Sequence, residues 1–312
     1  MNNKKKMHNS VLLKESIKEL KIKKDGLYID ATFGYGGHSK LILKSLNDNG
    51  MLYAFDQDPD AIAYAHTIKS NKIKIFHTRF SQIYKIACNE NINGKVDGIL
   101  IDLGMSNVQL QTASRGFSFM KDGLLDMRMN PQLGIPAFEW LNKEKEKNIA
   151  AVIKNFGEER FYKKIAYNIV QQAKKKPITR TIDLVNIIQR IIPKKTGLKH
   201  PATRTFQAIR IYINEELNEV NNVLLNAVKV LKKNGRIAII SFHSLEDRII
   251  KKFMNNFGKM KEFPSNMPIN EIQKKHFCKP ILKIFKKIKP SQDEIYNNPS
   301  ARSAILRVAE KK

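Results

Sequence analysis

The stretch "IDATFGYGGHS", from Ile29 to Ser39, places a cluster of glycines directly after a short apolar run. The run Leu27 to Ile29 is typical of a buried strand, and the apolar spacing after His38 is typical of a helix. The glycines therefore lie at a strand-to-helix turn. Because glycine has no Cβ atom, backbone N–H groups in such a turn can closely approach an anion or a cofactor.

Short apolar runs alternate with helical patterns from Leu27 to Asp102. This alternation predicts an α/β fold with a parallel, doubly wound sheet. The four predicted strands are "LYID" at 27–30, "MLYAFD" at 51–56, "IKIF" at 73–76 and "VDGILID" at 96–102.

The pattern changes after an aromatic, glycine-containing loop at 105–129. Residues 137–193 show only helical periods, which predicts a small all-helical insert. The strand pattern returns with "GRIAIISF" at 235–242 and "SAILRVAE" at 303–310. We therefore expect a sheet domain formed by residues 1–131 and 205–312, and a helical insert domain of residues 132–204.

Two helix predictions follow the insert. A long helix is expected from about Thr205, with Phe206, Ile209, Ile213, Leu217, Val220 and Leu224 on one face. A second helix is expected at "SLED", which matches a capping box with Ser244 at the N-cap and Asp247 at N3.

The composition favours a protein of the reducing cytoplasm. Cys88 and Cys278 are the two cysteines, and neither lies in a C-x-x-C pair. The N-terminus lacks the apolar run of a signal peptide, and no segment is long and apolar enough to span a membrane. The seven histidines have no H-x-H or H-E-x-x-H spacing, so no metal is expected.

The formal charge of +27 points to a polyanionic partner such as a nucleic acid. Only 12 of the 56 basic residues are arginines, and a gene rich in A and T would produce the excess lysine without any functional demand. Solvated surface charge is thus an equal explanation for the lysines, and the few arginines are more informative.

The glycine turn lacks two features of phosphate-binding loops. A dinucleotide fingerprint starting at Gly34 would need glycine where Ser39 stands, and no Gly-Lys-Ser/Thr sequence follows. Asp56 ends the next strand 20 residues after Gly36, where a carboxylate can bind a ribose diol. A tight turn with a ribose carboxylate, but no pyrophosphate site, fits S-adenosylmethionine.

A purely structural turn is the alternative. It is disfavoured because Asp30, Asp56 and Asp102 end three strands that share one sheet edge, where α/β folds form their binding crevice.

Asp102 is the candidate catalytic residue. Methylation of a base at a ring carbon needs a cysteine nucleophile, and neither cysteine lies at this edge. Methylation of an exocyclic amine instead needs hydrogen-bond acceptors aimed at its N–H groups, and Asp102 can supply one. Asp102 could alternatively cap a turn or serve only the cofactor.

Arginines and aromatic residues alternate in "RGFSFMKDGLLDMRM" at 115–129, a pattern suited to stacking on unpaired bases and to phosphate contact. Core anchoring is an equal explanation for Phe117 and Phe119. The candidate phosphate contacts, each of which could also pair with a carboxylate, are Arg115, Arg128, Arg204, Arg210 and Arg302.

The segment "SFHSLEDR" at 241–248 brings serine, histidine and aspartate together, but it lacks the flanking glycines of a nucleophile elbow, so we exclude a hydrolase.

The chain closely resembles the bacterial 16S ribosomal RNA cytosine-N4 methyltransferase family from His8 to about Glu310. The motifs that carry the resemblance are "HNSVLLKE", "YIDATFGYGGHS", "FDQDPDAI", "DGILIDLGMS", "RGFSF", "LDMRMN", "GEERF", "HPATRTFQAIRIYIN", "ISFHSLEDR" and "NPSARSAILR".

The resemblance implies a class I, Rossmann-like methyltransferase sheet with a helical insert, and S-adenosylmethionine as methyl donor. Its substrate would be cytidine 1402 in the 16S rRNA of the small ribosomal subunit. The family's cofactor contacts correspond to Gly36, Gly37, His38, Asp56, Phe80, Asp102 and Gln109.

The sequence departs from the family beside Gln109. The family has serine-serine-proline-glutamine-leucine-aspartate where this chain has Ser106 to Gln111, with Val108 in place of the proline. The family also has proline where Leu124 stands. Loss of a proline removes a restraint on φ, so the rigidity of the turn is in question.

Two other functions remain open from the sequence. A non-catalytic RNA-binding assembly factor would keep the fold and the basic surface without the chemistry, and the altered turn favours it. A DNA amino-methyltransferase would be expected to carry a proline-rich turn with an aromatic residue after Asp102, and Leu103 to Met105 lack one.

Overall fold

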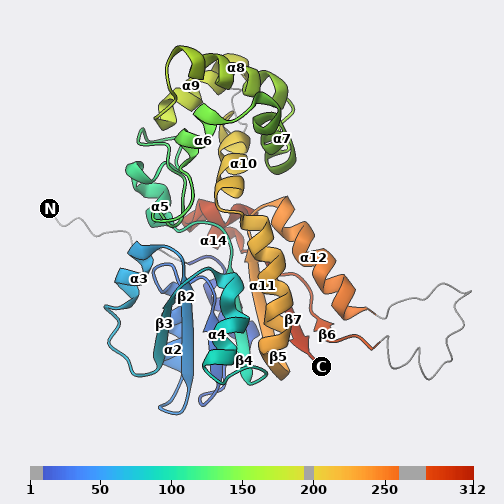
Figure 1. Cartoon of the computed structure of the whole chain (residues 1–312). Coiled ribbons are helices and arrows are strands. Elements are labelled where there is room, and N and C mark those ends of the chain that lie inside the picture. The colour runs from blue at the N-terminus through green and yellow to red at the C-terminus, as the bar shows by residue number, and fades with distance from the viewer. Residues whose placement is uncertain (1–9, 193–199, 260–278) are drawn as a thin grey trace, which may run out of the picture. The chain divides into compact units, whose positions relative to one another are not determined.

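The computed structural model describes residues 10–192, 200–259 and 279–312 (Figure 1). The chain divides into two compact units. The first, here called the sheet unit, comprises Met1–Gly104 and Leu217–Lys312, and the second, the helical unit, comprises Met105–Glu216.

The sheet unit contains a seven-stranded sheet in the order β3-β2-β1-β4-β5-β7-β6. Strands β1 to β5 pair in parallel, whereas β7 is antiparallel to both β5 and β6. The α/β class and the four strands expected from the N-terminal pattern are confirmed. The strands are β1 (Leu27–Asp30), β2 (Met51–Asp56), β3 (Ile73–His77), β4 (Val96–Asp102), β5 (Leu231–Ser241), β6 (Leu282–Ile284) and β7 (Ile305–Lys311).

Helices cover both faces of the sheet because successive strand residues point to opposite sides. Ile29, Ile99 and Ile101 pack with α4 (Ile83–Asn89), α11 (Glu216–Val230) and α12 (Ser244–Gly258). Tyr28 and Leu100 point to the other face and pack with α1 (Leu13–Leu20) and α2 (Gly37–Ser45). A third helix, α3 (Pro59–Ala65), packs its Ala65 against Ala54 of β2. Figure 1 shows this layered arrangement.

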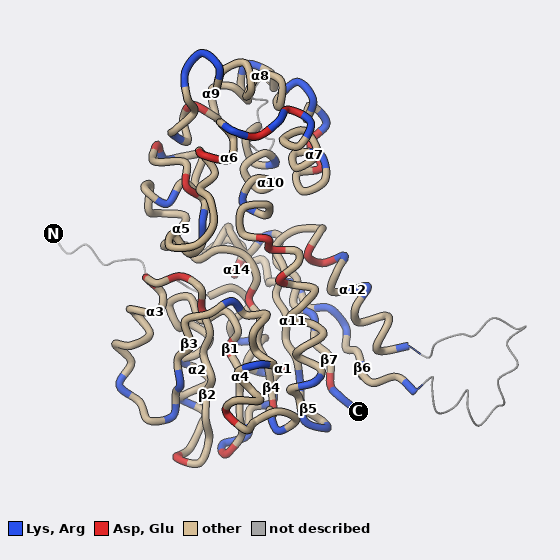
Figure 2. The backbone as a smooth tube through the Cα atoms, in the orientation of Figure 1, with Lys and Arg blue, Asp and Glu red and all other residues tan. Residues whose placement is uncertain are grey.

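The helical unit has its own apolar core. Its central members include Trp140, Ile153, Ile169 and Ile188, each from a different helix. The helices are α5 (Asn107–Gln111), α6 (Ala137–Lys143), α7 (Glu146–Gly157), α8 (Tyr162–Lys175), α9 (Thr181–Ile191) and α10 (Thr203–Ile213). Figure 2 shows Lys and Arg distributed over both units.

The boundaries of the units differ from the expected 131/132 and 204/205 because the loop that follows β4 packs into the helical core. Phe117 and Met127 are buried there. Asn214, at the end of α10, ties this loop down: its Oδ1 accepts from Met129 N at 2.7 Å, and its Nδ2 donates to Met127 O at 2.8 Å. Loop and α10 therefore belong to the same compact unit.

The long helix expected from Thr205 is wrong as a single element. It is two helices, α10 and α11, and Glu215 between them has a φ of 53°. The apolar stripe that suggested one helix is shared between two cores, since Phe206 and Ile209 belong to the helical core while Val220 and Leu224 belong to the sheet core.

Among the described residues, no helix has the length and apolar character needed to cross a membrane.

Candidate cofactor and active site

Three aspartates end neighbouring parallel strands at one edge of the sheet. Asp30 ends β1, Asp56 ends β2 and Asp102 ends β4. Strand β1 lies between β2 and β4, with Asp30 in register with Ala54 and Leu100. The binding crevice of an open α/β sheet lies at the carboxyl ends of its strands, so the expected clustering of carboxylates at this edge is confirmed.

The glycine turn connects β1 to α2 and requires glycine for backbone reasons. Gly34 and Gly36 have φ values of 55° and 71°, in the left-handed region that disfavours a Cβ atom. At Gly36 an added Cβ would also lie 2.9 Å from the Phe33 ring. Gly36 is the N-cap of α2, whose first turn has no side-chain cap.

The Asp56 carboxylate is fixed by two backbone groups. Its Oδ2 accepts from Gly34 N at 2.7 Å, and its Oδ1 accepts from Asp58 N at 2.9 Å. Burial raises the pKa of Asp56 to about 6 despite these hydrogen bonds. Each oxygen keeps a further lone pair, so Asp56 can accept additional hydrogen bonds from a ligand.

Asp30 serves the scaffold of the turn. Its side chain is fully buried, its Oδ2 accepts from Ser39 Oγ at 2.6 Å, and its Oδ1 accepts from Thr32 N at 3.2 Å. Burial raises its pKa to about 6. The hydrogen bond to Ser39 links the end of β1 to the first turn of α2.

Among the three aspartates at this edge, Asp102 has the fewest hydrogen-bond donors around its carboxyl group in the described part of the chain. Its Oδ1 is buried and has no hydrogen-bond partner in the described part of the chain, and its Oδ2 lies 3.7 Å from His38 Nδ1. Burial, followed by the charges of Asp30 and Glu246, raises its pKa well above the ordinary value. The ionised form of Asp102 is therefore disfavoured unless a positive charge lies nearby.

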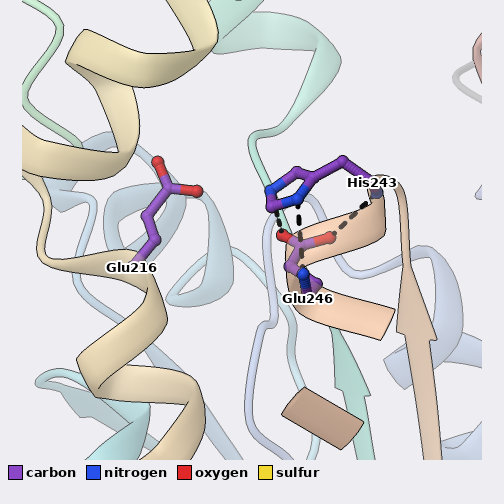
Figure 3. Close-up of side chains that lie close together, drawn as sticks. All are labelled: Glu216, His243 and Glu246. Atoms are coloured by element: carbon purple, nitrogen blue, oxygen red, sulfur yellow. Dashed lines mark hydrogen bonds and ion pairs between the residues drawn. The ribbon is translucent and has the colours of Figure 1, made fainter. Parts of the chain in front are cut away.

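The first turn of α12, which follows β5, supplies Glu246, which the sequence reasoning missed. Its Oε2 accepts from Phe242 N at 2.8 Å, and its Oε1 lies 3.1 Å from His243 Nε2 (Figure 3). Strand β5 pairs with β4, and Ile240 is in register with Asp102.

The predicted capping box at Ser244 and Asp247 is wrong by one residue. His243 is the N-cap and Glu246 is N3, while Asp247 binds the Arg307 guanidinium at 2.7 and 3.0 Å. A glutamate three residues after the N-cap is a capping signal, and this spacing identifies Glu246 once histidine is accepted as the N-cap.

Two further predicted cofactor residues, Phe80 and Gln109, belong to different compact units. Phe80 begins a short 3-10 turn after β3 in the sheet unit and packs partly against the core. Gln109 belongs to the helical unit, where its Oε1 accepts from Ser106 N at 2.9 Å. Ser106 Oγ accepts from Gln109 N in return, and this capping box restrains the turn that lacks the proline.

Three of the predicted arginines are engaged within the helical unit. Arg128 forms a two-bond pair with Asp126, and Arg210 does the same with Glu216. Arg115 donates to the carbonyl groups of Arg128 and Met129.

Arg204 and Arg302 are exposed. Arg204 of the helical unit donates to Glu158 O at 3.3 Å, and Arg302 of the sheet unit lies in the 3-10 turn η3 (Pro299–Ser303) that precedes β7.

Cys88, the cysteine among the described residues, lies away from the carboxyl ends of the strands. Cys88 is an exposed residue of α4, and Cys278 lies outside the described residues.

A glycine turn after β1, with acidic residues at the carboxyl ends of β2 and β4, is typical of α/β folds that bind nucleosides. The chain matches the model of the MraW methylase family over residues 5–312, and it belongs to that family. It is therefore a methyltransferase, and the resemblance stated from the motifs is confirmed.

Curated relatives match over nearly their whole length. The chain is 53% identical over 303 residues to the ribosomal RNA small subunit methyltransferase H of Buchnera aphidicola subsp. Acyrthosiphon pisum (strain APS), covering 97% of each chain. It is 54% identical over 305 residues to the protein of that name from Buchnera aphidicola subsp. Baizongia pistaciae (strain Bp), again covering 97% of each.

Among solved structures, an rRNA methylase from Streptococcus thermophilus is matched at a TM-score of 0.41 and 9% identity, covering 95% of this chain and 92% of that one. The family assignment rests on the sequence matches.

The raised pKa of Asp102 predicts a pH-dependent effect of Asp102→Asn on stability. A carboxyl group with a raised folded-state pKa favours folding at low pH, and this contribution is lost as pH rises through that pKa. The melting temperature of the variant relative to wild type should therefore increase between pH 5 and pH 8. Each kcal/mol of change in the free energy of unfolding should shift the melting temperature by roughly 2–4 °C.

Differential scanning fluorimetry across this pH range measures the effect, with Asp48→Asn in an exposed loop as control. A difference in melting temperature that stays constant or falls with pH would contradict the assigned electrostatics of Asp102.

Proposed function

We propose that this protein transfers a methyl group from S-adenosylmethionine to the exocyclic N4 amine of cytidine 1402 in the 16S rRNA of the small ribosomal subunit. Membership of the methylase family and the names of relatives more than 50% identical support this assignment. The structural observation that carries the chemistry is the buried Asp102 Oδ1 that has no hydrogen-bond partner among the described residues.

The residues at the carboxyl edge fit a cationic cofactor. Burial raises the pKa values of the carboxyl groups of Asp30, Asp56 and Asp102, and at Asp56 and Asp102 the charges of nearby carboxylates add to this effect. A positive charge nearby would relieve this cost. The bound cofactor supplies a methyl group on a positively charged sulfur.

Within the sheet unit, the residues that would hold the cofactor are Gly36, Gly37, His38, Asp56 and Phe80. Asp56 is suited to a ribose diol because two backbone N–H groups fix the direction of its oxygens. Gln109 of the helical unit is a further proposed contact. Its turn is held by the Ser106 capping box, so the missing proline does not leave this turn unrestrained.

Asp102 has two tasks in this reaction. The lone pair of an exocyclic amine is delocalised into the base, and an acceptor at the amine N–H favours the more pyramidal nitrogen of the transition state. The nitrogen carries a surplus proton after it gains a methyl group. Asp102 Oδ1 can accept that proton when the carboxyl group is ionised, a form that burial disfavours and that a nearby positive charge restores.

For RNA contact, Arg204 and Arg302 are the best placed of the five arginines because both are exposed. Arg115, Arg128 and Arg210 would have to share or exchange their present partners to bind a phosphate. The net charge of +27 suits a ribosomal RNA substrate, and we place the reaction in the cytoplasm, where small subunits are available.

Nucleoside mass spectrometry of small-subunit rRNA tests the proposal. Deletion of the gene should remove N4-methylcytidine from the segment that contains position 1402, and expression of the wild-type gene should restore it. If the modification were unchanged after deletion, the proposed reaction would be wrong. A non-catalytic assembly factor would restore subunit maturation without changing this nucleoside.

Asp56 and Asp102 should affect different kinetic constants. Asp102→Ala should lower kcat by about 10²- to 10³-fold because an acceptor for the reacting amine is lost. Asp56→Ala should mainly weaken cofactor binding, by about 10- to 100-fold, because charged hydrogen bonds to the ribose are lost. Steady-state kinetics and calorimetry separate the two effects, with Asp48→Ala as control. Near-normal turnover by Asp102→Ala would refute its catalytic role.

A further inference from the structure

Gly37, the first residue of α2, is not required for backbone reasons. It lacks the positive φ that distinguishes Gly34 and Gly36. An ideal Cβ atom at Gly37 would instead lie 1.8 Å from Ser10 Oγ and 3.1 Å from Ser10 Cβ. The space that a side chain at position 37 would occupy is therefore filled by the hydroxyl group of Ser10.

The chain next to Ser10 is held in an unfavourable conformation. Leu12 is fully buried and left-handed, with φ 50° and ψ 35°, although it is not a glycine. Such a conformation costs on the order of 1–3 kcal/mol and persists only where the surroundings enforce it. The position of Ser10 is therefore fixed by contacts and does not follow from local backbone preference.

One of these contacts comes from the far end of the sequence. Leu12 N donates a 2.6 Å hydrogen bond to Glu294 Oε1 in the helix α14 (Gln292–Asn297). A carboxylate acceptor makes this bond stronger than one between neutral groups. Ser291 caps α14 by accepting from Glu294 N, so the glutamate is itself held in place.

The topology explains how α14 reaches the site. Strand β7 runs antiparallel to β5, and its first residue, Ile305, is opposite Ser241 at the carboxyl edge. The segment that precedes β7 therefore arrives at the edge where Asp30 and Asp102 lie. Its residue Ala301 belongs to the same core cluster as Leu12 and Ile42 of α2.

We propose that Ser10 is a further residue of the cofactor site and that Glu294 positions it there. This inference rests on the proposed function. The cofactor carries a carboxylate as well as a sulfonium, and the aspartates of the carboxyl edge would repel that carboxylate. A neutral hydroxyl next to the uncapped first turn of α2 provides a donor for the anionic end of the cofactor.

Calorimetric titration of S-adenosylmethionine into the full-length protein tests the role of Ser10. Ser10→Ala removes the hydroxyl and keeps the Cβ atom, so we expect about 10- to 100-fold weaker binding, the range for one lost hydrogen bond to a charged group. The melting temperature of the cofactor-free protein should change by no more than about 2 °C, since one partly buried hydroxyl is removed.

Glu294 provides an independent variant. Glu294→Ala should weaken cofactor binding by a similar factor because Leu12 N loses its acceptor, whereas Glu294→Gln should retain most of the affinity because its amide oxygen can still accept. Asp293→Ala, on the exposed side of the same short helix, is the matched control and should bind like wild type.

A double-mutant cycle connects Ser10 to Gly37. If Gly37→Ala acts by displacing the Ser10 hydroxyl, then adding Ser10→Ala to Gly37→Ala should cause little further loss of affinity. Additive losses would contradict the proposal, as would wild-type affinity in Ser10→Ala. If the wild-type protein failed to bind S-adenosylmethionine, the proposed function would be wrong. If the wild-type protein bound the cofactor normally and Ser10→Ala bound it equally well, only the role of Ser10 would be wrong.

Discussion

The burial of several carboxyl groups at one sheet edge, with little positive charge to balance them, is the constraint on which the site depends. Asp30 and Asp56 are stabilised by hydroxyl and backbone donors, which offset part of the cost of burial. Asp102 has no such compensation at Oδ1 in the described part of the chain, and Glu246 adds a further nearby charge. Protonation of the carboxyl group, or a positively charged ligand beside it, removes this cost.

The scaffold around this edge explains why the carboxyl groups stay in place. Asp30 joins β1 to α2 through Ser39, and Asp56 joins β2 to the glycine turn through Gly34. Asp102 N donates to Thr32 Oγ1 at 2.7 Å, which fixes the end of β4 to the same turn. A single loop of the sequence therefore orients the ends of three strands.

The sequence was sufficient to predict the strands, the glycine turn and the three carboxylates at the sheet edge, because these depend on local periodicity and on the rule that parallel strands share a carboxyl edge. It did not reveal the break at Glu215, since the apolar period continues across it while the residues before and after pack into different cores. Nor did the sequence indicate that residues 105–131 belong to the helical compact unit. Their partners, such as Asn214, are distant in sequence.

The same limit applies to the site. Glu246 was missed because histidine is an unusual N-cap, and no local pattern connects Ser10 to Gly37 or Leu12 to Glu294. The roles assigned to His38, Phe80 and Gln109 came from the family resemblance alone. Contacts between residues tens or hundreds of positions apart become visible only when the fold is known.

Proton release on cofactor binding tests the charge balance most directly. Calorimetry at pH 6.5 in buffers of different ionisation enthalpy counts the protons exchanged when S-adenosylmethionine binds. A cation beside Asp102 lowers the raised pKa values at this edge, so net proton release is predicted, and S-adenosylhomocysteine, which lacks the sulfonium charge, should release fewer protons. Proton uptake, or equal release with both ligands, would contradict the view that uncompensated carboxyl groups form the site for a cationic cofactor.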